Sequence, residues 1–363
     1  MIIGVDGNEA NVKERVGVSV YALKLLQYFK KSANSETQFI VYLRNSPNIN
    51  LPSENKYYKY QIIKGKHFWI QFFLPLHLFF KRNINVFFAP AHYSPSFCPV
   101  PIVVTIHDLA YYYYPNEFLK KDLYKLKNWT KASITKARQI IAVSKTTKKD
   151  IHKFYTLEDS KVRVVYNGYE KKPITKSLKL KTDISITNKP YLLYVGTLQP
   201  RKNILTLIKA FEIIKKTHSD LELIIAGKKG WLYEDIFLKV EEMGLEDCVY
   251  FTGFITDQQL SYLYQNARCL ILPSLYEGFG LPILEAMSFD CPVISSFAAS
   301  LPEIGGDACL YFDPNSDKDL AEKINSLLIN DQLRLDLINK GKTRVKEFSW
   351  NKCGEETLKL LRG

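Results

Sequence analysis

The amino-acid sequence predicts a protein of the α/β class with two domains, each built on a parallel β-sheet. Strand-length apolar runs alternate with helical stretches along most of the 363 residues, which is the order that βαβ units require. The chain length fits about two domains. A stretch rich in Lys, Ser and Thr near the middle lacks an apolar face and therefore separates the two halves.

The predicted strands fall into one set for each half of the chain. In the first half they occupy residues 2–5, 39–43, 86–89, 102–106, 139–143 and 162–165. In the second half they occupy residues 191–195, 221–226, 249–252, 269–272, 293–295 and 310–312. The predicted organisation is a first domain at 1–170, a linker at 171–189, a second domain at 190–349 and a final helical segment at 350–363.

The composition is that of an ordinary globular protein, because 46% of the residues are hydrophobic. The formal net charge of +13 favours anionic partners: nucleic acid, an acidic membrane surface or phosphorylated ligands. The basic residues are spread widely and match no nucleic-acid-binding motif, so we expect no nucleic-acid partner. The six cysteines include no Cys-x-x-Cys pair, and the first residues resemble a buried strand more than a leader. We therefore expect a cytoplasmic protein with reduced thiols.

Residues 273–286 carry the strongest functional signal. A buried strand runs into a loop that holds Glu277 and two glycines, and Pro282 stands where a helix would begin. The free N–H groups of that helix favour an anion such as a diphosphate, and Gly280 lets the backbone approach it. Glu285, about one turn in, can accept hydrogen bonds from a diol. The pattern indicates a nucleotide sugar, and the alternative is a structural strand–loop–helix with incidental carboxylates.

Two acidic residues separated by seven others around Glu-Gly-Phe-Gly-Leu-Pro resemble the signature of group 1 glycosyltransferases (family 4). The resemblance covers essentially the whole chain. It implies the GT-B fold, with two facing Rossmann-like domains and a C-terminal helix that crosses back to the first, acceptor-side domain. The second domain would bind the donor. The implied reaction is the retaining transfer of a hexose to a hydroxyl of a cell-surface polysaccharide or a lipid-linked oligosaccharide.

Arg201 and Lys202 are the predicted diphosphate ligands. They follow the strand at 191–195, just ahead of a helix, in a segment that resembles the family's phosphate-binding motif. Arg offers a planar fork for two oxygens and Lys a compact charge, although two solvated cations are the alternative. They would stabilise the leaving nucleoside diphosphate, a role that a metal plays in other enzymes. No Asp-x-Asp pair stands at a strand end, so we expect no metal and no cofactor beside the nucleotide-sugar substrate.

His107 and Gly17 are the candidates in the first half. His107 follows the strand at 102–106, and the resemblance implies that it touches the donor sugar near the reacting carbon; a structural histidine is the alternative. Gly17 stands where many members have two glycines that let the backbone reach the phosphate or acceptor, and a plain turn is equally compatible. His107, Glu277, Arg201 and Lys202 are thus the candidate catalytic residues.

The remaining candidates bind the donor. Glu285 is expected at the ribose, and the loop residues Phe279, Gly280 and Leu281 with Glu277 at the sugar. The backbone of Gly253, Phe254 and Ile255 is expected to border the nucleobase. GDP-mannose is the favoured donor, because His-Asp-Leu and Ala-Gly-Lys-Lys-Gly-Trp resemble the mannosyltransferase branch. A UDP-hexose is the close alternative, and a non-catalytic sugar-nucleotide binder needs the same loop.

Residues 64–82 depart from the alternation of strands and helices. Their apolar part is too short for a transmembrane helix, which needs about 20 apolar residues. Two interpretations remain open. The segment either packs within the first domain or lies peripherally on an anionic membrane, with aromatic residues inserted and Lys64, Lys66, Lys81 and Arg82 on the head groups.

Overall fold

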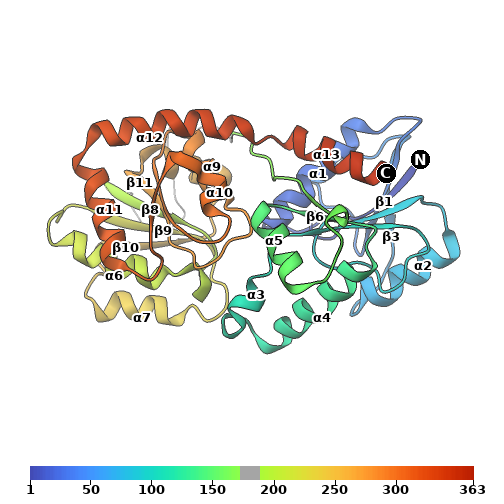
Figure 1. Cartoon of the computed structure of the whole chain (residues 1–363), viewed down its shortest axis with the longest axis horizontal. Coiled ribbons are helices and arrows are strands. Elements are labelled where there is room, and N and C mark those ends of the chain that lie inside the picture. Colours follow the sequence, from blue (N-terminus) through green and yellow to red (C-terminus); the bar gives the residue numbers. More distant parts are fainter. Residues whose placement is uncertain (172–188) are drawn as a thin grey trace. The chain divides into compact units, whose positions relative to one another are not determined.

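The computed structural model describes residues 1–171 and 189–363, so the predicted linker lies almost entirely outside the described residues. The chain forms two compact units (Figure 1). The first comprises Met1–Tyr113, Lys120–Gly168 and Phe348–Gly363, and the second comprises Tyr114–Leu119 and Tyr169–Glu347. The short segment Tyr114–Leu119 thus belongs to the second unit, although the first unit continues on both sides of it.

The first unit is built on a seven-stranded parallel sheet with the order β3-β2-β1-β4-β5-β6-β7. Its strands are β1 (Ile2–Asp6), β2 (Gln38–Leu43), β3 (Tyr58–Ile62), β4 (Val86–Ala89), β5 (Ile102–Ile106), β6 (Gln139–Ala142) and β7 (Val162–Val164). Every residue of β4 and β5 is buried, because helices cover both faces of a parallel sheet. The strand order reverses between β1 and β4, which makes this the topological switch point of the sheet.

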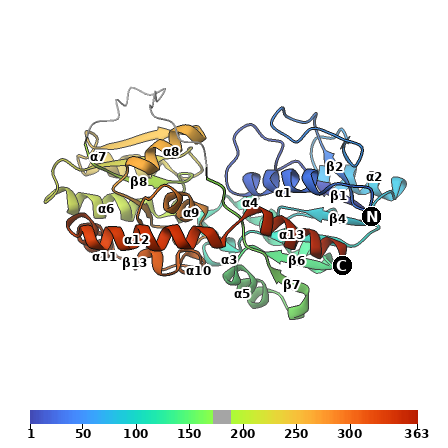
Figure 2. The same cartoon turned by 90° about the horizontal axis from the view of Figure 1, so that it is seen from above.

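The helices of the first unit include one from the far end of the chain. They are α1 (Val18–Ser32), a π-helical turn η1 (Trp69–Phe73), α2 (Leu74–Lys81), α3 (Ala110–Tyr113), α4 (Lys120–Lys136), α5 (Lys145–Phe154), the 3₁₀ turn η3 (Asp159–Lys161) and α13 (Trp350–Arg362). Helix α13 packs beside α1 (Figure 2). A Cβ at Gly354 would lie 2.2 Å from Cγ of Tyr28, so this close helix contact requires glycine.

The second unit repeats the plan with a six-stranded parallel sheet of order β10-β9-β8-β11-β12-β13. Its strands are β8 (Tyr191–Val195), β9 (Glu222–Ala226), β10 (Val249–Gly253), β11 (Cys269–Leu272), β12 (Val293–Ser296) and β13 (Cys309–Phe312). The strand order reverses between β8 and β11. The carboxyl ends of these two strands therefore form the switch point, where open parallel sheets bind ligands.

Helices flank this second sheet as well. They are η2 (Pro115–Glu117), η4 (Pro200–Lys202), α6 (Ile204–Lys215), α7 (Glu234–Glu242), α8 (Asp257–Asn266), α9 (Leu281–Ser288), α10 (Leu301–Gly305), η5 (Gly306–Ala308), α11 (Asp317–Ile329), α12 (Asp331–Arg344) and η6 (Val345–Glu347). Helices α6 and α11 pack against each other beside the sheet, and their apolar faces share one buried cluster with β8 and β9. A reciprocal Thr256–Gln259 capping box starts α8.

The two parallel sheets confirm the predicted α/β class. Strand β3 was missed, because Tyr58–Ile62 is a half-exposed edge strand with lysine and glutamine among its residues and no apolar run. Residues 64–82 form η1 and α2, which bury Trp69 but expose several neighbouring aromatic rings. In the described ranges no helix is both long and apolar enough to cross a membrane. All six cysteines have free thiols.

Candidate functional site

The switch point of the second sheet brings two predicted segments together. Strand β8 leads into η4, which carries Arg201 and Lys202, and β11 leads into the loop that carries Glu277. The two segments are joined through the backbone, since the N–H of Leu275 donates to the carbonyl oxygen of Arg201 at 2.9 Å. Residues far apart in sequence are therefore neighbours because their strands are adjacent in the sheet.

A cluster of three charges lies at this junction. Lys202 forms an ion pair and a hydrogen bond with Oε1 of Glu277, and Nη1 of Arg201 lies 3.6 Å from Oε2. All three side chains are only 12–14% exposed. Burial alone would raise the pKa of Glu277, but the charges of Lys202 and Arg201 outweigh it and lower the pKa below its usual value. The cluster is thus ionised at neutral pH and carries one net positive charge.

Serines hold the Glu277 loop in place. The hydroxyl of Ser274 donates to Oε1 of Glu277 at 2.7 Å. The Ser300 hydroxyl lies 2.8 Å from the backbone carbonyl of Glu277 and 3.1 Å from that of Phe279. The sequence alone does not indicate these positioning roles. Ser300 immediately precedes α10.

Glu285 and Gly280 lie at the start of α9. Gly280 caps this helix with φ +101°, a conformation that favours glycine, and a Cβ there would lie 2.7 Å from Leu301 Cδ2. One turn further on, the hydroxyl of Tyr264 donates to Oε2 of Glu285 at 3.0 Å. Tyr264 is fully buried, so it orients the carboxylate from within the core. Tyr264 carried no signal in the sequence, because a buried tyrosine in a helix is ordinary core.

The remaining predicted donor residues have different degrees of exposure. Phe279 is buried, and Leu281 is partly exposed at the first position of α9. Gly253 ends β10 with φ +67°, followed by Phe254, which is 45% exposed, and Ile255. The carbonyl oxygen of Gly253 accepts a hydrogen bond from the N–H of Gly227 at 3.1 Å, which ties the ends of β10 and β9 together.

His107 and Gly17 belong to the first unit. His107 directly follows β5 and is 7% exposed, with Nε2 at 2.8 Å from the carbonyl oxygen of Pro90. A carbonyl only accepts hydrogen bonds, so Nε2 carries the proton. Burial, then the nearby His92 ring, lowers the pKa of His107 to about 3, so the imidazole is neutral at physiological pH. Gly17 precedes α1 with φ +47°.

The chemistry that the second-unit cluster offers is the binding of an oxyanion. Two consecutive cations on η4, one with a planar fork, match the oxygens of a phosphate or diphosphate. The N-terminus of α9, which follows the Glu277 loop, adds the positive end of a helix dipole. Within the ranges 1–171 and 189–363, no group of three His, Cys, Asp or Glu side chains is arranged to hold a metal ion.

Comparisons with known proteins agree with this geometry. Residues 16–172 match the family described as "Glycosyltransferase Family 4", and residues 179–344 match "Glycosyl transferases group 1". An O-antigen chain mannosyltransferase B of Escherichia coli is 32% identical over 70% of this chain and 68% of its own length. The O-antigen chain mannosyltransferase RfbU of Salmonella typhimurium is 30% identical over 62% of this chain and 60% of its own length.

Solved structures show the same fold at lower sequence identity. A sucrose-phosphate synthase from Thermosynechococcus elongatus superimposes with a TM-score of 0.78, covering 99% of this chain and 98% of its own, at 19% identity. The Anabaena protein HepE in complex with UDP-glucose gives a TM-score of 0.75, with 99% of both chains covered, at 18% identity. The two sheets, the matched families and the relatives lead to one conclusion: this chain is a glycosyltransferase of the GT-B fold and belongs to the group 1 family, family 4.

Proposed function

We propose that this enzyme transfers a hexose, with retention of anomeric configuration, from a nucleotide sugar to a hydroxyl of a polysaccharide or lipid-linked oligosaccharide. GDP-mannose is the proposed donor. The observation that carries the proposal is the junction of Arg201, Lys202 and Glu277 at the switch point of the second sheet. The choice of mannose is supported by two relatives that are named as mannosyltransferases of O-antigen chains.

In this proposal Arg201 and Lys202 bind the donor diphosphate and stabilise it as the glycosidic bond breaks. They are paired with Glu277, so the incoming phosphate competes with a carboxylate for the same two cations. Glu277 holds both cations at the junction before the phosphate arrives, and charges positioned in advance stabilise the negative charge of a leaving group. The two cations supply the charge that a divalent metal supplies elsewhere, and we expect turnover in the presence of a chelator.

We assign the other parts of the donor to residues of the same region and of the first unit. Glu285, oriented by Tyr264, would accept hydrogen bonds from the ribose diol. The loop at 279–281 and Glu277 would border the sugar, and residues 253–255 the nucleobase. From the first unit, Gly17 and the neutral His107 would act on the donor phosphate and sugar. Because the Nε2 proton is donated to Pro90, the neutral His107 ring would accept a single hydrogen bond at Nδ1, and it would not carry charge.

Retention is proposed to occur by a front-face route in which the departing phosphate takes the proton of the acceptor hydroxyl. Glu277 is the carboxylate that we place beside the sugar, and it is already paired with two cations. An ion-paired carboxylate of lowered pKa is a weak nucleophile. Trapping a covalent glycosyl-enzyme on Glu277 by mass spectrometry contradicts this route.

A second candidate donor is a UDP-hexose. The structure of the Anabaena protein HepE, which shares the fold, is described as a complex with UDP-glucose. The decisive experiment is a calorimetric panel of GDP-mannose, UDP-glucose, UDP-galactose and their N-acetyl forms, with chelator and then with Mg²⁺. Micromolar binding of GDP-mannose alone supports the proposal, and selective binding of a UDP-sugar replaces the donor. Binding of one sugar nucleotide without transfer or slow hydrolysis identifies a non-catalytic binder instead.

We further propose that the first unit contacts an anionic membrane through η1 and α2, as a peripheral protein at the inner face of the cell membrane. Phe72 is 60% and Phe80 73% exposed on this segment, which is a large apolar area for a protein surface. Lys81 and Arg82 follow Phe80 in the sequence, the Arg82 guanidinium lies 5.2 Å from the ring centroid of Phe79, and the chain as a whole carries +13. Aromatic insertion with cations on the head groups is the arrangement by which interfacial helices bind anionic lipid.

A further inference from the structure

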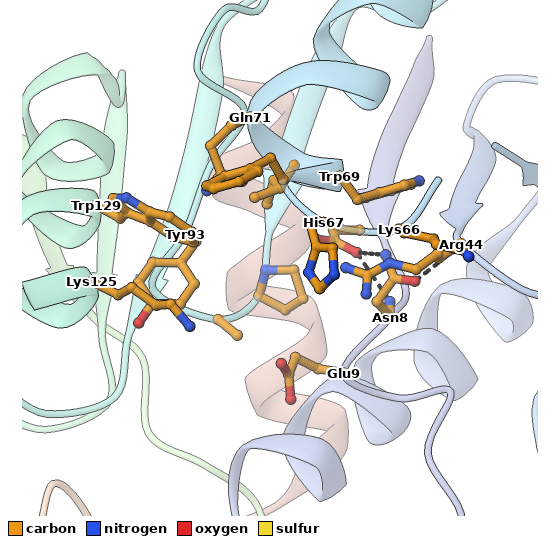
Figure 3. A pocket seen from close by; sticks show the side chains of 15 residues that line it. Asn8, Glu9, Arg44, Lys66, His67, Trp69, Gln71, Tyr93, Lys125 and Trp129 are labelled. Atoms are coloured by element: carbon orange, nitrogen blue, oxygen red, sulfur yellow. Dashed lines mark hydrogen bonds between the residues drawn. The ribbon is translucent and has the colours of Figure 1, made fainter. Parts of the chain in front are cut away.

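A pocket opens at the switch point of the first sheet. It has a volume of about 260 Å³, and its lining includes Asp6, the last residue of β1, together with Glu9 and Pro90, which follow β1 and β4. Figure 3 shows Tyr93 and Trp129 across the cavity from the residues that follow β1. Open parallel sheets bind ligands at this position. The volume of the pocket lies just below the range of ligand-binding pockets, which begins at roughly 300 Å³. We call it the switch-point pocket.

The switch-point pocket combines acceptor groups with aromatic faces. Glu9 is an exposed residue, although desolvation and the nearby Asp6 raise the pKa of its carboxyl group. Asp6 is fixed by hydrogen bonds from the N–H and the side-chain amide of Asn8 at 3.0 and 2.7 Å. The rings of Tyr93 and Trp129 meet edge to face, with centroids 5.5 Å apart. Carboxylates accept hydrogen bonds from vicinal hydroxyls, and aromatic faces cover the C–H face of a sugar ring. This lining fits a saccharide unit.

A second pocket, of about 940 Å³, adjoins the first and has a different chemistry. Arg44, Lys64, Lys66 and His67 line it, and no carboxylate does. Arg44, Lys66 and His67 line both pockets, so the two form one continuous surface. In the described part of the chain none of these basic side chains forms an ion pair within 4.0 Å of a carboxylate, although the charge of Arg44 acts on Asp6 and opposes the rise that burial causes in the pKa of that carboxyl. We call this the basic pocket, and it fits a phosphate.

From these adjoining pockets we infer that the first unit binds a saccharide that carries a phosphate or diphosphate on its reducing end. The sugar lies in the switch-point pocket against Trp129 and Glu9, and the phosphate lies in the basic pocket on Lys66 and Arg44. The inference rests on the proposed function, because it makes this phosphorylated saccharide the acceptor. A lipid-linked sugar diphosphate and a soluble glycosyl phosphate share this chemistry.

The test is a calorimetric titration of the full chain with mannose 1-phosphate, N-acetylglucosamine 1-phosphate and N-acetylgalactosamine 1-phosphate. The free sugars and inorganic phosphate are titrated in parallel. At least one glycosyl phosphate is expected to bind about tenfold more tightly than both its free sugar and inorganic phosphate, since each half of the site contributes. Equal binding of inorganic phosphate, or no binding of any glycosyl phosphate, overturns the inference.

Single-residue variants test which pocket binds the sugar and which binds the phosphate. Lys66→Ala is expected to remove the roughly tenfold advantage of the phosphate, and Glu9→Gln to weaken both the free and the phosphorylated sugar. Lys59→Ala and Glu36→Gln change the same charges at exposed positions of the same unit and serve as matched controls. Losses of equal size in the controls show a nonspecific charge effect and overturn the assignment. Lys202→Ala must leave this binding unchanged if the site lies in the first unit.

Two further measurements distinguish a lipid-linked from a soluble acceptor, and a failure of this inference from a failure of the proposed function. In the first, the affinity of the protein for phosphatidylcholine vesicles that contain a polyprenyl diphosphate saccharide is compared with its affinity for the soluble glycosyl phosphate. The vesicles bind either more tightly than the soluble compound or no more tightly. The first result identifies a lipid-linked acceptor and the second a soluble one, and both support the site. Nucleotide-sugar binding is measured on the same samples. If donors bind and glycosyl phosphates do not, this inference fails while the proposed function stands; the reverse result rejects the donor site alone.

Discussion

Lys202 and Glu277 form a buried ion pair across the switch point of the second sheet, although they lie 75 positions apart in the sequence. The pair joins the loop after β8 to the loop after β11, and Arg201 adds a second cation to the same carboxylate. A buried carboxylate without these cations would be strongly disfavoured. The cations that we assign to the donor phosphate therefore also stabilise the loop that would hold the donor sugar.

Replacing Glu277 separates these two roles. We expect Glu277→Gln to bind a nucleoside diphosphate as tightly as the wild type or up to about tenfold more tightly, because the phosphate no longer competes with a carboxylate. Turnover is expected to fall, because the cations lose the group that positions them. Calorimetry and initial rates measure the two effects. The control is Glu241→Gln, an exposed carboxylate on α7; weaker nucleotide binding in Glu277→Gln alone contradicts the competition.

Replacing Lys202 should have the opposite effect on binding. Lys202→Ala removes one charge-assisted hydrogen bond to the donor phosphate, worth about 1.5–3 kcal/mol, so affinity is expected to fall roughly ten- to a hundredfold. It also leaves Glu277 buried with only Arg201 as its cationic partner, and the thermal unfolding midpoint should decrease. The double variant with Glu277→Gln should recover the midpoint, while its affinity should stay roughly ten- to a hundredfold below that of Glu277→Gln alone. An affinity equal to that of Glu277→Gln alone means that Lys202 does not touch the phosphate.

The role of Glu285 can be tested with nucleotides that lack the ribose diol. We expect wild-type protein to bind a nucleoside diphosphate about tenfold more tightly than its 2′,3′-dideoxy analogue, and Glu285→Gln to lose much of this discrimination. Tyr264→Phe should weaken binding less, because it only removes the hydrogen bond that orients the carboxylate. If Glu285→Gln discriminates between the two nucleotides as the wild type does, Glu285 is not at the ribose.

The lowered pKa of His107 predicts that the folded protein loses stability at acidic pH. Its pKa is lowered from an ordinary value to about 3, so the unfolded chain binds a proton between these values that the folded chain does not. Stability is therefore lost as the pH falls through this window, by at most about 1.4 kcal/mol per pH unit. His107→Gln should show a smaller decrease in unfolding midpoint between about pH 7 and about pH 5. The exposed His67→Gln is the control, and equal pH dependence of His107→Gln and wild type refutes the prediction.

The membrane contact predicts a lipid-dependent phenotype. The double variant Phe72→Ser, Phe80→Ser should lose co-sedimentation with vesicles that contain about 30% phosphatidylglycerol, since each ring buries a large apolar area on insertion. Leu238→Ser, at a residue 60% exposed in the second unit, is the matched control. Binding should weaken with added salt and on pure phosphatidylcholine. Equal sedimentation of both variants excludes η1 and α2 as the contact.

The elements of this fold were predictable where a local pattern was strong. Strands β4, β5, β8 and β11 are short apolar runs between polar segments, and their bounds agree with the predicted ranges. Strand β3 was not predictable in the same way, because its exposed edge position selects polar residues and weakens the pattern. The π-helical turn of η1 likewise depends on packing, since it buries Trp69 while its neighbours remain exposed.

The site shows the same division. The sequence by itself determined which loops are the candidates for the donor site, because Glu277, Glu285, Arg201 and Lys202 follow predicted strands and a glycine–proline pattern marks the helix start. Only the tertiary structure decided that Glu277 is paired with both cations, that Tyr264 orients Glu285 and that Asp6, Glu9 and Trp129 line a pocket. The physical reason is the range of the interactions. Strand and helix signals arise between near neighbours in sequence, whereas these contacts depend on which strands lie side by side in the sheet.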